Sequence, residues 1–322
     1  MHHWGRRGAL AWLLWPASLV FRVVVVTRRF FYKIKIFGSK HPGIPVIVVG
    51  NLTAGGSGKT PLVLWIAELL REHKWKPGIV SRGYGGSVQV PTEATIASEP
   101  AEVGDEPMLL ARRSHCPVWV APDRVAACRV LRERHPECDV IVTDDGLQHY
   151  ALARDIEICV VDGRGFGNGF LMPAGPLREP ASRLRSVDAV VAHEAPGASG
   201  HAMRLEGESL VRITNAQDVR AAKSFAGQKV HAVAGIGDPQ RFFRHLARFG
   251  IQAMPHAFPD HHAFRAPDLE FGDAAPVVMT EKDAVKCKRF AKENHWVFPV
   301  SAALDPAFER WLLGRLSGSK AA

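Results

Sequence analysis

The chain has 322 residues, 47% of them hydrophobic, which is enough for one large domain or two modest ones with packed cores. Its five cysteines form no C-x-x-C pair, which favours a reducing environment with buried thiols over a disulfide framework. The formal net charge is +9, but residues 1–40 hold eight basic and no acidic residues, so the remainder is nearly neutral, with 33 basic against 32 acidic residues. This distribution argues against a nucleic-acid-binding face on the folded part of the chain.

The N-terminal segment combines the basic residues with an apolar stretch. Residues 9–21 read ALAWLLWPASLVF, and these thirteen residues are too few for a membrane span, which needs about 20 residues. Pro16 is expected to kink or end a helix there, and the tryptophans of the segment suit the headgroup region of a bilayer. We therefore predict that residues 1–36 form an interfacial, monotopic anchor whose basic residues are attracted to anionic lipid.

Three other interpretations of this segment stay open at this point. They are a cleaved signal peptide, a short spanning helix, and a buried amphipathic helix with a solvated basic face. The signal peptide is disfavoured because no persuasive small-residue cleavage site follows the apolar run. The motif at 46–60, described next, also indicates a domain that stays in the cytosol.

The next element is a nucleotide-binding signature. Residues 46–60 read VIVVGNLTAGGSGKT, an apolar strand followed by a glycine-rich turn. In such a turn backbone N–H groups surround the β-phosphate, Lys59 reaches the β- and γ-phosphates, and the Thr60 hydroxyl ligates Mg²⁺. The pattern G-x-x-x-x-G-K-[ST] has glycine where this chain has Thr53, so a chance Gly-Lys-Thr in a glycine-rich turn is the alternative. The residues predicted to bind the nucleotide are Thr53, Ala54, Gly55, Gly56, Ser57, Gly58, Lys59 and Thr60.

After this motif, short apolar runs alternate with helical patterns. Strands are predicted at 45–50, 78–81, 117–121, 139–143, 156–161 and 187–192, and helices at 60–74, 105–114, 122–135 and 178–186. Strands separated by helices pair in parallel through right-handed crossovers. The alternation therefore predicts a doubly wound, mostly parallel α/β sheet that binds ligands at the carboxyl ends of its strands.

A second α/β pattern follows a less regular stretch at 195–229. Its predicted strands lie at 229–235, 276–280 and 296–300, with a helix near 239–249 and a last helix at the C-terminus. We therefore predict three parts, namely a membrane-anchoring segment at 1–40, a P-loop core at 41–220 and a smaller C-terminal α/β lobe at 221–322.

Two loops early in the first pattern carry charged side chains. Residues 81–85 read SRGYG and place Arg82 in a flexible loop that suits an anion. The motif GDEP at 104–107 stands before a helical run. Asp105 at that position can orient or deprotonate an attacking hydroxyl, whereas helix capping by Asp105 and Glu106 is the simpler interpretation.

Two later loops supply carboxylates. The stretch DVIVTDD is an apolar strand that ends in Asp144 and Asp145. NTPases place the acid that holds Mg²⁺, directly or through water, at such a point, although Asp-Asp-Gly is also good turn chemistry. The proline-stiffened loop LMPAGPLREP at 171–180 carries Arg178 and Glu179. Arg178 can contact phosphate and Glu179 can join the metal shell, or the loop is purely structural.

The C-terminal pattern holds two further motifs. FPDHH ends in His261 and His262, and adjacent histidines lack the spacing and the additional ligands of a metal site. Asp260 beside His261 suits a proton-handling unit, because a carboxylate fixes the tautomer of an imidazole and raises its basicity, and a surface turn is the alternative. The run TEKD at 280–283 resembles the base-reading loop of GTPases only loosely, so it does not predict guanine specificity.

Taken in order, these motifs resemble one family. The runs GNLTAGGSGKTP, SRGYGG, GDEP, TDDGLQH, MPAGPLREP, FPDHHAF and TEKDAVK are similar to those of the tetraacyldisaccharide 4′-kinases, the lipid A 4′-kinases. The resemblance covers nearly the whole chain, including the apolar and basic N-terminus. Thr53 in place of the first loop glycine is the family's own variant.

The resemblance implies a P-loop kinase core with a smaller C-terminal lobe. It implies transfer of the γ-phosphoryl group of ATP, with Mg²⁺, to the 4′-hydroxyl of tetraacyldisaccharide 1-phosphate, which gives lipid IVA. An acceptor with four acyl chains stays in the bilayer. We therefore expect a peripheral or monotopic protein at the cytoplasmic face of the bacterial inner membrane, monomeric and without a nucleic-acid partner.

The resemblance also implies roles for individual residues. The aspartate of GDEP and the first histidine after FPD act in the family as a dyad around the attacking hydroxyl, and these positions are Asp105 and His261 here. The other implied site residues are Lys59 as a catalytic charge, Asp144, Asp145 and Glu179 at the magnesium and phosphate site, and Arg82 and Arg178 for the substrate.

The alternative from another class is a membrane-associated P-loop ATPase that acts as a switch. The glycine-rich loop and the basic anchor fit a switch equally well. The clusters around Asp105, Glu179 and His261 do not, since a switch needs no base for an acceptor hydroxyl in a second lobe.

Overall fold

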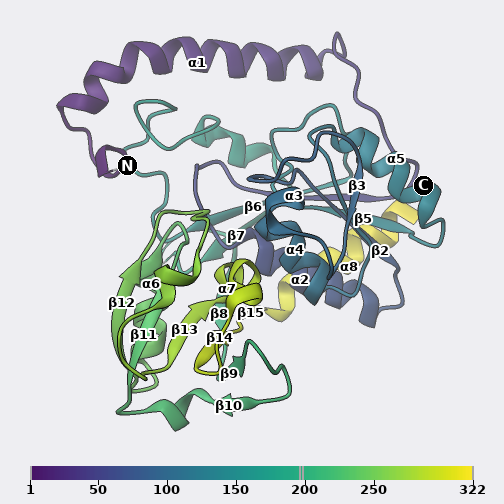
Figure 1. Cartoon of the computed structure of the whole chain (residues 1–322). Helices are drawn as coiled ribbons and strands as arrows, with labels where there is room; N and C mark the ends of the chain where they lie inside the picture. The colour runs from purple at the N-terminus through teal and green to yellow at the C-terminus, as the bar shows by residue number, and fades with distance from the viewer. Residues whose placement is uncertain (1, 196, 198, 321–322) are drawn as a thin grey trace.

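The computed structural model describes residues 2–195, 197 and 199–320, and within them the larger of two sheets has nine strands (Figure 1). Their order across the sheet is β15-β8-β7-β6-β1-β5-β2-β4-β3. The strands are β1 (Val46–Gly50), β2 (Pro77–Ser81), β3 (Thr92–Ala94), β4 (Val118–Val120), β5 (Val140–Thr143), β6 (Ile156–Asp162), β7 (Ala189–His193), β8 (His201–Glu206) and β15 (Ser301–Leu304). Neighbours pair in parallel except β3 with β4 and β8 with β15, which confirms the predicted mostly parallel sheet.

Helices cover both faces of this sheet. The helices are α2 (Lys59–Glu72), α3 (Pro100–Val103), α4 (Asp105–Arg113), α5 (Arg124–Arg134) and α8 (Pro306–Lys320). Ile47 and Val49 of β1 pack with α2, α4 and α8, whereas Val46 and Val48 pack with α5 on the other face. A strand covered on both faces reads as a continuous apolar run, and this explains the uninterrupted VIVV of β1.

The smaller lobe is built on a six-stranded sheet of order β10-β9-β14-β13-β11-β12 in the part of the chain that the structure describes. Its elements are β9 (Ser209–Arg212), β10 (Val219–Ala221), β11 (Lys229–Ala234), α6 (Pro239–Ala247), β12 (Gln252–Ala257), β13 (Val277–Thr280), α7 (Glu281–Cys287) and β14 (His295–Phe298). The short 3₁₀ helices of the chain are η1 (His2–Gly5), η2 (Ala181–Ser186), η3 (Ala222–Phe225), η4 (Ala266–Leu269) and η5 (Lys288–Phe290). The predicted helix at 178–186 is therefore wrong, because the chain enters this segment through Pro180 and forms only η2.

The chain crosses between the sheets more than once. β9 and most of β10 precede residue 221 yet belong to the smaller sheet, and β15 returns from the C-terminal part to pair with β8 of the larger sheet. Phe308 of α8 is fully buried, with its ring 5.6 Å from that of Trp65 in α2. Sheet membership thus partitions the chain differently from a single cut at 220, and the three-part division stays a prediction about domains.

Helix α1 (Ala9–Lys33) lies along one side of the larger lobe (Figure 1). The prediction was that Pro16 kinks or ends a helix, and the helix does not end there but continues to Lys33. Pro16 has no N–H to donate to the carbonyl of Trp12, so the helix lacks one hydrogen bond at this point. Among the described residues this is the one helix long and apolar enough to cross a membrane, although a signal sequence or the core helix of a soluble protein meets the same test.

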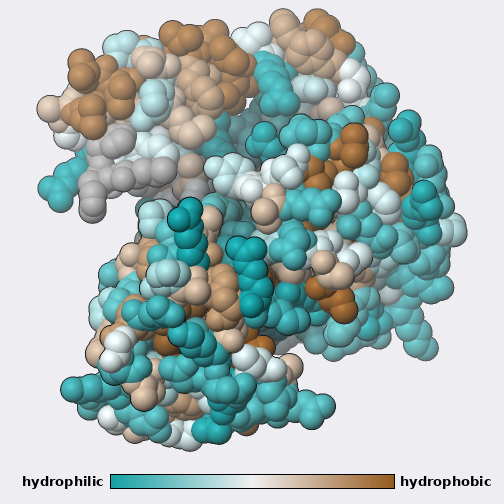
Figure 2. All heavy atoms as spheres, viewed as in Figure 1, coloured by the Kyte–Doolittle hydropathy of each residue, from teal (hydrophilic) through white to brown (hydrophobic). Residues whose placement is uncertain are grey.

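The two sides of α1 differ. Ser18 is buried, and its Oγ donates to Leu171 O at 2.8 Å and accepts from Ala174 N at 3.0 Å. The opposite side leaves Leu13 76% and Val20 66% exposed, and Figure 2 shows the apolar surface that follows the helix. One stripe of α1 therefore docks on the protein while another presents apolar side chains to the outside.

Phe308→Ala should destabilise the larger lobe, although Phe308 lies in the C-terminal segment. Removal of a fully buried ring from between α2 and α8 leaves a cavity, and the free energy of unfolding should fall by about 3–5 kcal/mol in a chemical denaturation experiment. The exposed Arg310 of the same helix provides the control, and Arg310→Ala should stay within about 0.5 kcal/mol of wild type. Equal effects of the two changes would mean that α8 does not pack as described.

Candidate active site

The glycine-rich loop connects β1 to α2. Gly55 and Gly58 have φ values of +100° and +90°, which side chains rarely adopt. A Cβ on Gly58 would lie 2.4 Å from Nδ1 of His193, so glycine is required there also for space. The hydroxyl of Ser57 is buried and has no hydrogen-bond partner among the described residues. Such a loop can turn its N–H groups and one free hydroxyl toward an anion.

The first half of the loop is tied to the proline-rich segment. Thr53 forms a β-bridge with Leu177, and Ala54 N donates to Pro176 O at 2.9 Å. These bonds explain how a threonine is accommodated where the general pattern has glycine, since this part of the loop is extended against a neighbour.

Lys59 and Arg178 both converge on Asp145. Lys59 Nζ lies 3.5 Å from Asp145 Oδ1 and 3.2 Å from Oδ1 of the buried Asn51. Arg178 Nη1 contacts the two carboxylate oxygens of Asp145 at 2.9 and 2.8 Å. Burial would raise the pKa of Asp145, but Lys59 and Arg178 hold it well below its usual range, so this carboxylate stays ionised.

Asp144 lies in a different environment. Its Oδ2 accepts a hydrogen bond from Thr60 Oγ1 at 3.1 Å, and its Oδ1 is buried without a hydrogen-bond partner among the described residues. Burial, and to a smaller extent the charge of Glu106, raise the pKa of Asp144 to about 7. A hydroxyl beside an unpartnered carboxylate oxygen is a donor set that fits a hard divalent cation.

The described residues contain no cluster of three or more His, Cys, Asp or Glu side chains that could hold a metal ion. This arrangement is compatible with Mg²⁺, which protein sites usually bind through one or two carboxylates and substrate phosphates. Glu179 is buried but engaged elsewhere, because it accepts hydrogen bonds from Tyr150 and, at 3.1 Å, from Gln148 Nε2. Its metal role stays a prediction.

The Asp105–His261 contact joins the two lobes. Asp105 is the first residue of α4, and its Oδ2 lies 3.2 Å from Nδ1 of His261 in the loop after β12. Gly104 is the N-cap of α4 and no side chain caps the helix, although Asp105 and Glu106 both lie in its first turn, where a negative charge is favourable. Burial would raise the pKa of Asp105, but the hydrogen bond with His261 and the charges of Lys286 and Lys282 hold it below its usual value.

The surroundings of the dyad include the SRGYG loop. The ring of Tyr84 meets the His261 ring edge-on, with centroids 4.9 Å apart. His262 points elsewhere and pairs with Asp268 at 3.1 Å, so the two adjacent histidines have separate partners. Arg82 is exposed, and the structure describes no hydrogen bond or ion pair of its side chain.

Some residues of this region were not singled out in the sequence. Asn51 binds Lys59, Arg124 donates to the backbone oxygen of Asp145 at 2.7 Å, and Lys282 contacts His261. Asn51 lies inside the glycine-rich motif and Lys282 inside TEKD, so a recognised motif pointed to both residues. Arg124 lies at the start of a helix of ordinary composition, and no motif pointed to it.

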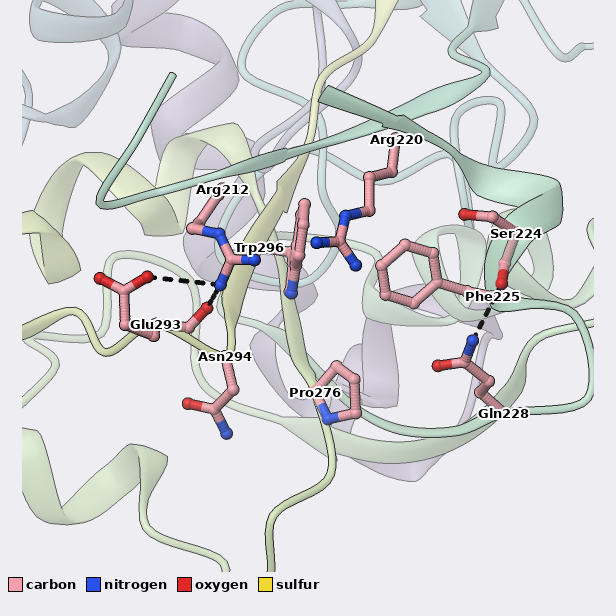
Figure 3. Close-up of a pocket in the computed structure, with 9 residues that line it drawn as sticks. All are labelled: Arg212, Arg220, Ser224, Phe225, Gln228, Pro276, Glu293, Asn294 and Trp296. Carbon is pink, nitrogen blue, oxygen red and sulfur yellow. Dashed lines mark hydrogen bonds and ion pairs between the residues drawn. The ribbon is translucent and has the colours of Figure 1, made fainter. Parts of the chain in front are cut away.

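Two hollows accompany these residues. A cleft of about 530 Å³ opens beside Asp105 and His261 and is bordered by Arg112, Lys288 and Arg289. The other, of about 430 Å³, lies on the smaller lobe away from the dyad (Figure 3). There Arg212 and Arg220 flank Trp296, and both arginines are paired with Asp218, so the hollow offers no unpaired cation.

A glycine-rich phosphate loop at the centre of a doubly wound sheet, faced by a second lobe, defines the protein as a P-loop NTPase-type phosphotransferase. The family model for Tetraacyldisaccharide-1-P 4′-kinase, LpxK, matches residues 10–317, and the chain belongs to that family. This membership confirms the resemblance drawn from the seven motifs.

Individual relatives agree with the family. The tetraacyldisaccharide 4′-kinase of Methylobacillus flagellatus is 50% identical over 307 residues, which cover 95% of this chain and 92% of the relative. That of Nitrosococcus oceani is 48% identical, with 98% and 94% covered. The crystal structure of LpxK from Aquifex aeolicus in complex with ATP superposes with a TM-score of 0.79 at 26% identity, covering 95% of this chain and 99% of that one.

His149 in the TDDGLQH motif provides a pH-dependent check of this region. Its Nε2 is buried without a hydrogen-bond partner among the described residues, and burial together with Arg124 lowers its pKa to about 4. The folded protein therefore keeps His149 neutral, whereas the unfolded chain binds a proton below about pH 6.5. The contribution of neutral His149 to the free energy of unfolding is fully present above about pH 6.5 and is lost as the pH falls toward 4.

His149→Asn should remove this acid sensitivity. Between pH 7 and pH 5, wild type should lose more unfolding free energy than the variant. The additional loss should be about 1 kcal/mol after allowance for solvent screening. Urea denaturation at the two pH values measures this difference, and any cavity left by the substitution affects both values alike. The same difference at both pH values would contradict a neutral, buried His149.

Proposed function

We propose that the protein transfers the γ-phosphoryl group of ATP to the 4′-hydroxyl of tetraacyldisaccharide 1-phosphate, which gives lipid IVA. The observation that carries this proposal is the 3.2 Å contact between Asp105 and His261, which is made between the two lobes in a chain of the 4′-kinase family. ATP as the donor is supported by the relative whose crystal structure is described as a complex with ATP.

In this proposal residues 53–60 bind the phosphates of ATP. Gly55 and Gly58 provide the positive φ values of the loop, and Lys59 would contact the β- and γ-phosphates. Arg178 and Lys59 both contact the carboxylate of Asp145. Together the two cations offset the charge that spreads over the γ-phosphoryl oxygens during transfer.

Thr60 and Asp144 would hold Mg²⁺, with Asp145 and Glu179 as the further candidates. The support is the unpartnered Oδ1 of Asp144 beside the Thr60 hydroxyl. When bound, the ion would supply positive charge that offsets the charge of the phosphates. Asp144 must be ionised to bind it, and a cation beside this buried carboxylate would favour the ionised form.

Asp105 is the proposed base for the acceptor. Its Oδ2 is engaged by His261, and its Oδ1 has no hydrogen bond that the structure describes, so Oδ1 is available to the hydroxyl. As the 4′-oxygen forms a bond to the γ-phosphorus, the bond to the β–γ bridging oxygen breaks and ADP leaves. The hydroxyl proton passes to Asp105 Oδ1 and later to solvent.

The membrane side of the proposal rests on α1. Its exposed apolar stripe and the basic residues of the N-terminal segment suit the surface of an anionic bilayer. We place the protein at the cytoplasmic face of the bacterial inner membrane, with α1 lying in the interface, as a monomer. Arg82, exposed and unpaired in the described part of the chain, is proposed to contact an anionic group of the substrate.

The decisive assay uses purified protein in detergent with γ-labelled ATP, Mg²⁺ and tetraacyldisaccharide 1-phosphate. Wild type should form a labelled lipid, Lys59→Ala should not, and Asp105→Asn should lower turnover by about 10²–10⁴-fold while ATP affinity changes little. Phosphate release that depends on Lys59 and on lipid, without a labelled lipid, would favour the membrane-associated ATPase switch and reject the kinase.

Binding of α1 to a bilayer can be tested separately from chemistry. Leu13→Asp with Val20→Asp puts two charges on the exposed apolar stripe and should reduce sedimentation with vesicles of anionic phospholipid, because burial of charge in the interface is unfavourable. ATP affinity should not change. Val90→Asp with Val219→Asp, at exposed apolar sites outside α1, adds the same charge and should leave vesicle binding intact. Equal losses in both variants would reject α1 as the membrane contact.

A further inference from the structure

Lys282 lies at a rigid point of the smaller lobe. It is the second residue of α7, whose first turn is capped by Thr280. The fully buried Asp283 beside it accepts hydrogen bonds from Gly235 N at 2.9 Å and from Thr280 Oγ1 at 2.6 Å. The start of α7 is therefore fixed to β11 and β13, and the direction in which Lys282 leaves the helix is fixed with it.

The ammonium group of Lys282 has three partners for its three N–H donors. Nζ lies 2.9 Å from Asp260 Oδ1, 3.1 Å from Glu106 Oε1 and 3.2 Å from Nε2 of His261. Burial would lower the pKa of Lys282, but Glu106 and Asp260 raise it well above its usual value. Lys282 is thus a charged, fully paired cation beside Nε2 of His261, the ring nitrogen that does not face Asp105.

This contact determines which nitrogen of His261 carries the proton. An ammonium group has only donors, so a hydrogen bond between Lys282 and His261 requires Nε2 to be the acceptor. Nε2 is then unprotonated, and Nδ1 carries the hydrogen that faces Asp105 Oδ2 at 3.2 Å. The imidazole is neutral and donates to Asp105, which leaves the carboxylate ionised and in place.

We propose, on the basis of the kinase function above, that Lys282 is a positioning residue of the phosphotransfer site. It holds His261 in the neutral tautomer with the proton on Nδ1, so that Asp105 and not His261 receives the proton of the attacking hydroxyl. Lys282 itself touches neither the hydroxyl nor the phosphates.

The same cation connects the two lobes. Glu106 follows Asp105 in α4 of the larger lobe, whereas Asp260, His261 and Lys282 belong to the smaller one. The ammonium group can reach Glu106 only when α4 and α7 are packed together. In this proposal the tautomer of His261 is set when the lobes pack together. The protonation state of His261 then depends on the contact between the lobes.

The charged groups around His261 fit this assignment. Asp105 faces Nδ1 from α4, Lys282 faces Nε2 from α7, and Asp260 on the same loop lies 3.8 Å from Nε2. The Tyr84 ring packs edge-on from the loop after β2, and Lys286 of α7 lies 3.6 Å from the oxygen of Asp105 that His261 contacts. Without Lys282, Nε2 would be left beside the Asp260 carboxylate, an arrangement that favours its protonation.

Lys282→Met tests the proposal in the labelled-lipid assay. The turnover number should fall by about 10–100-fold with the KM for ATP within about twofold of wild type, because positioning and not nucleotide binding is lost. The activity of the variant should recover partly as the pH rises, since deprotonation of Nε2 restores the neutral imidazole. Lys282→Arg keeps the charge and the donors, and it should recover most of the activity.

Lys292 provides the matched control. It is an exposed lysine of the smaller lobe that pairs with Glu270 at 2.9 Å, and Lys292→Met should leave turnover and its pH profile unchanged. An active wild type with a Lys282→Met variant of unchanged turnover at every pH would overturn the inference. A wild type that forms no labelled lipid would reject the proposed function instead, so the two failures are distinguishable.

A measurement on the unsubstituted protein keeps the inference testable if Lys282→Met does not fold. Nitrogen NMR of ¹⁵N-histidine-labelled protein, with His261→Gln to identify the signals, reports the tautomer directly. At pH 7 we expect a protonated Nδ1 and an unprotonated Nε2 on His261. A proton on Nε2, in a neutral ring or an imidazolium, would overturn the assignment.

Discussion

The arrangement of the site depends on the parallel pairing of β1 with β5 inside a sheet that is covered on both faces. Because Val48 and Thr143 are in register, the phosphate loop and the Asp144–Asp145 pair leave the sheet at the same edge. The two adjacent aspartates then meet opposite environments. Asp145 is held ionised by Lys59 and Arg178, whereas burial raises the pKa of Asp144. Of the two carboxylates in this short loop, Asp145 stays ionised and pairs with Lys59 and Arg178. Asp144 is suited to a metal ion.

The contact between Asp105 and His261, the proposed dyad, depends on how the lobes are attached, since neither lobe contains both residues. β15 and α8 return to the larger sheet after the smaller lobe is complete, so the smaller lobe is held by two chain segments. Val285 of α7 packs into the core of the larger lobe, where α4 also packs. Apolar contact between α4 and α7 therefore brings Asp105 to His261, and the polar contacts of Lys282 adjust the final geometry.

Local sequence patterns predicted much of this structure, and particular residues show which features such patterns do not predict. Short-range apolar periodicity predicts strands β1, β2, β4, β5, β6 and β7 of the larger sheet, and the resemblance predicts the phosphate loop and the order of motifs. The short edge strand β3 was not predicted. The return of β15 to β8 does not, because a strand pair separated by about a hundred residues leaves no local periodicity. Lys282 was passed over because TEKD was compared with a base-reading loop, whereas its lysine points at a histidine. The helix predicted at 178–186 is absent as an α-helix, because the chain forms only the 3₁₀ helix η2 after Pro180.

The N-terminal helix has a closer relation to the phosphate loop than an anchor requires. Ser18 binds the backbone of Leu171, Leu171 forms a bridge with Leu177, and Leu177 in turn forms a bridge with Thr53 of the loop. The docked stripe of α1 is thus connected through three contacts to Thr53 of the glycine-rich loop, while its exposed stripe faces outward. A bilayer that binds the exposed stripe would hold the phosphate loop at a fixed distance from its surface. For an acceptor whose acyl chains stay in the membrane, that distance decides whether its sugar hydroxyl reaches the γ-phosphate.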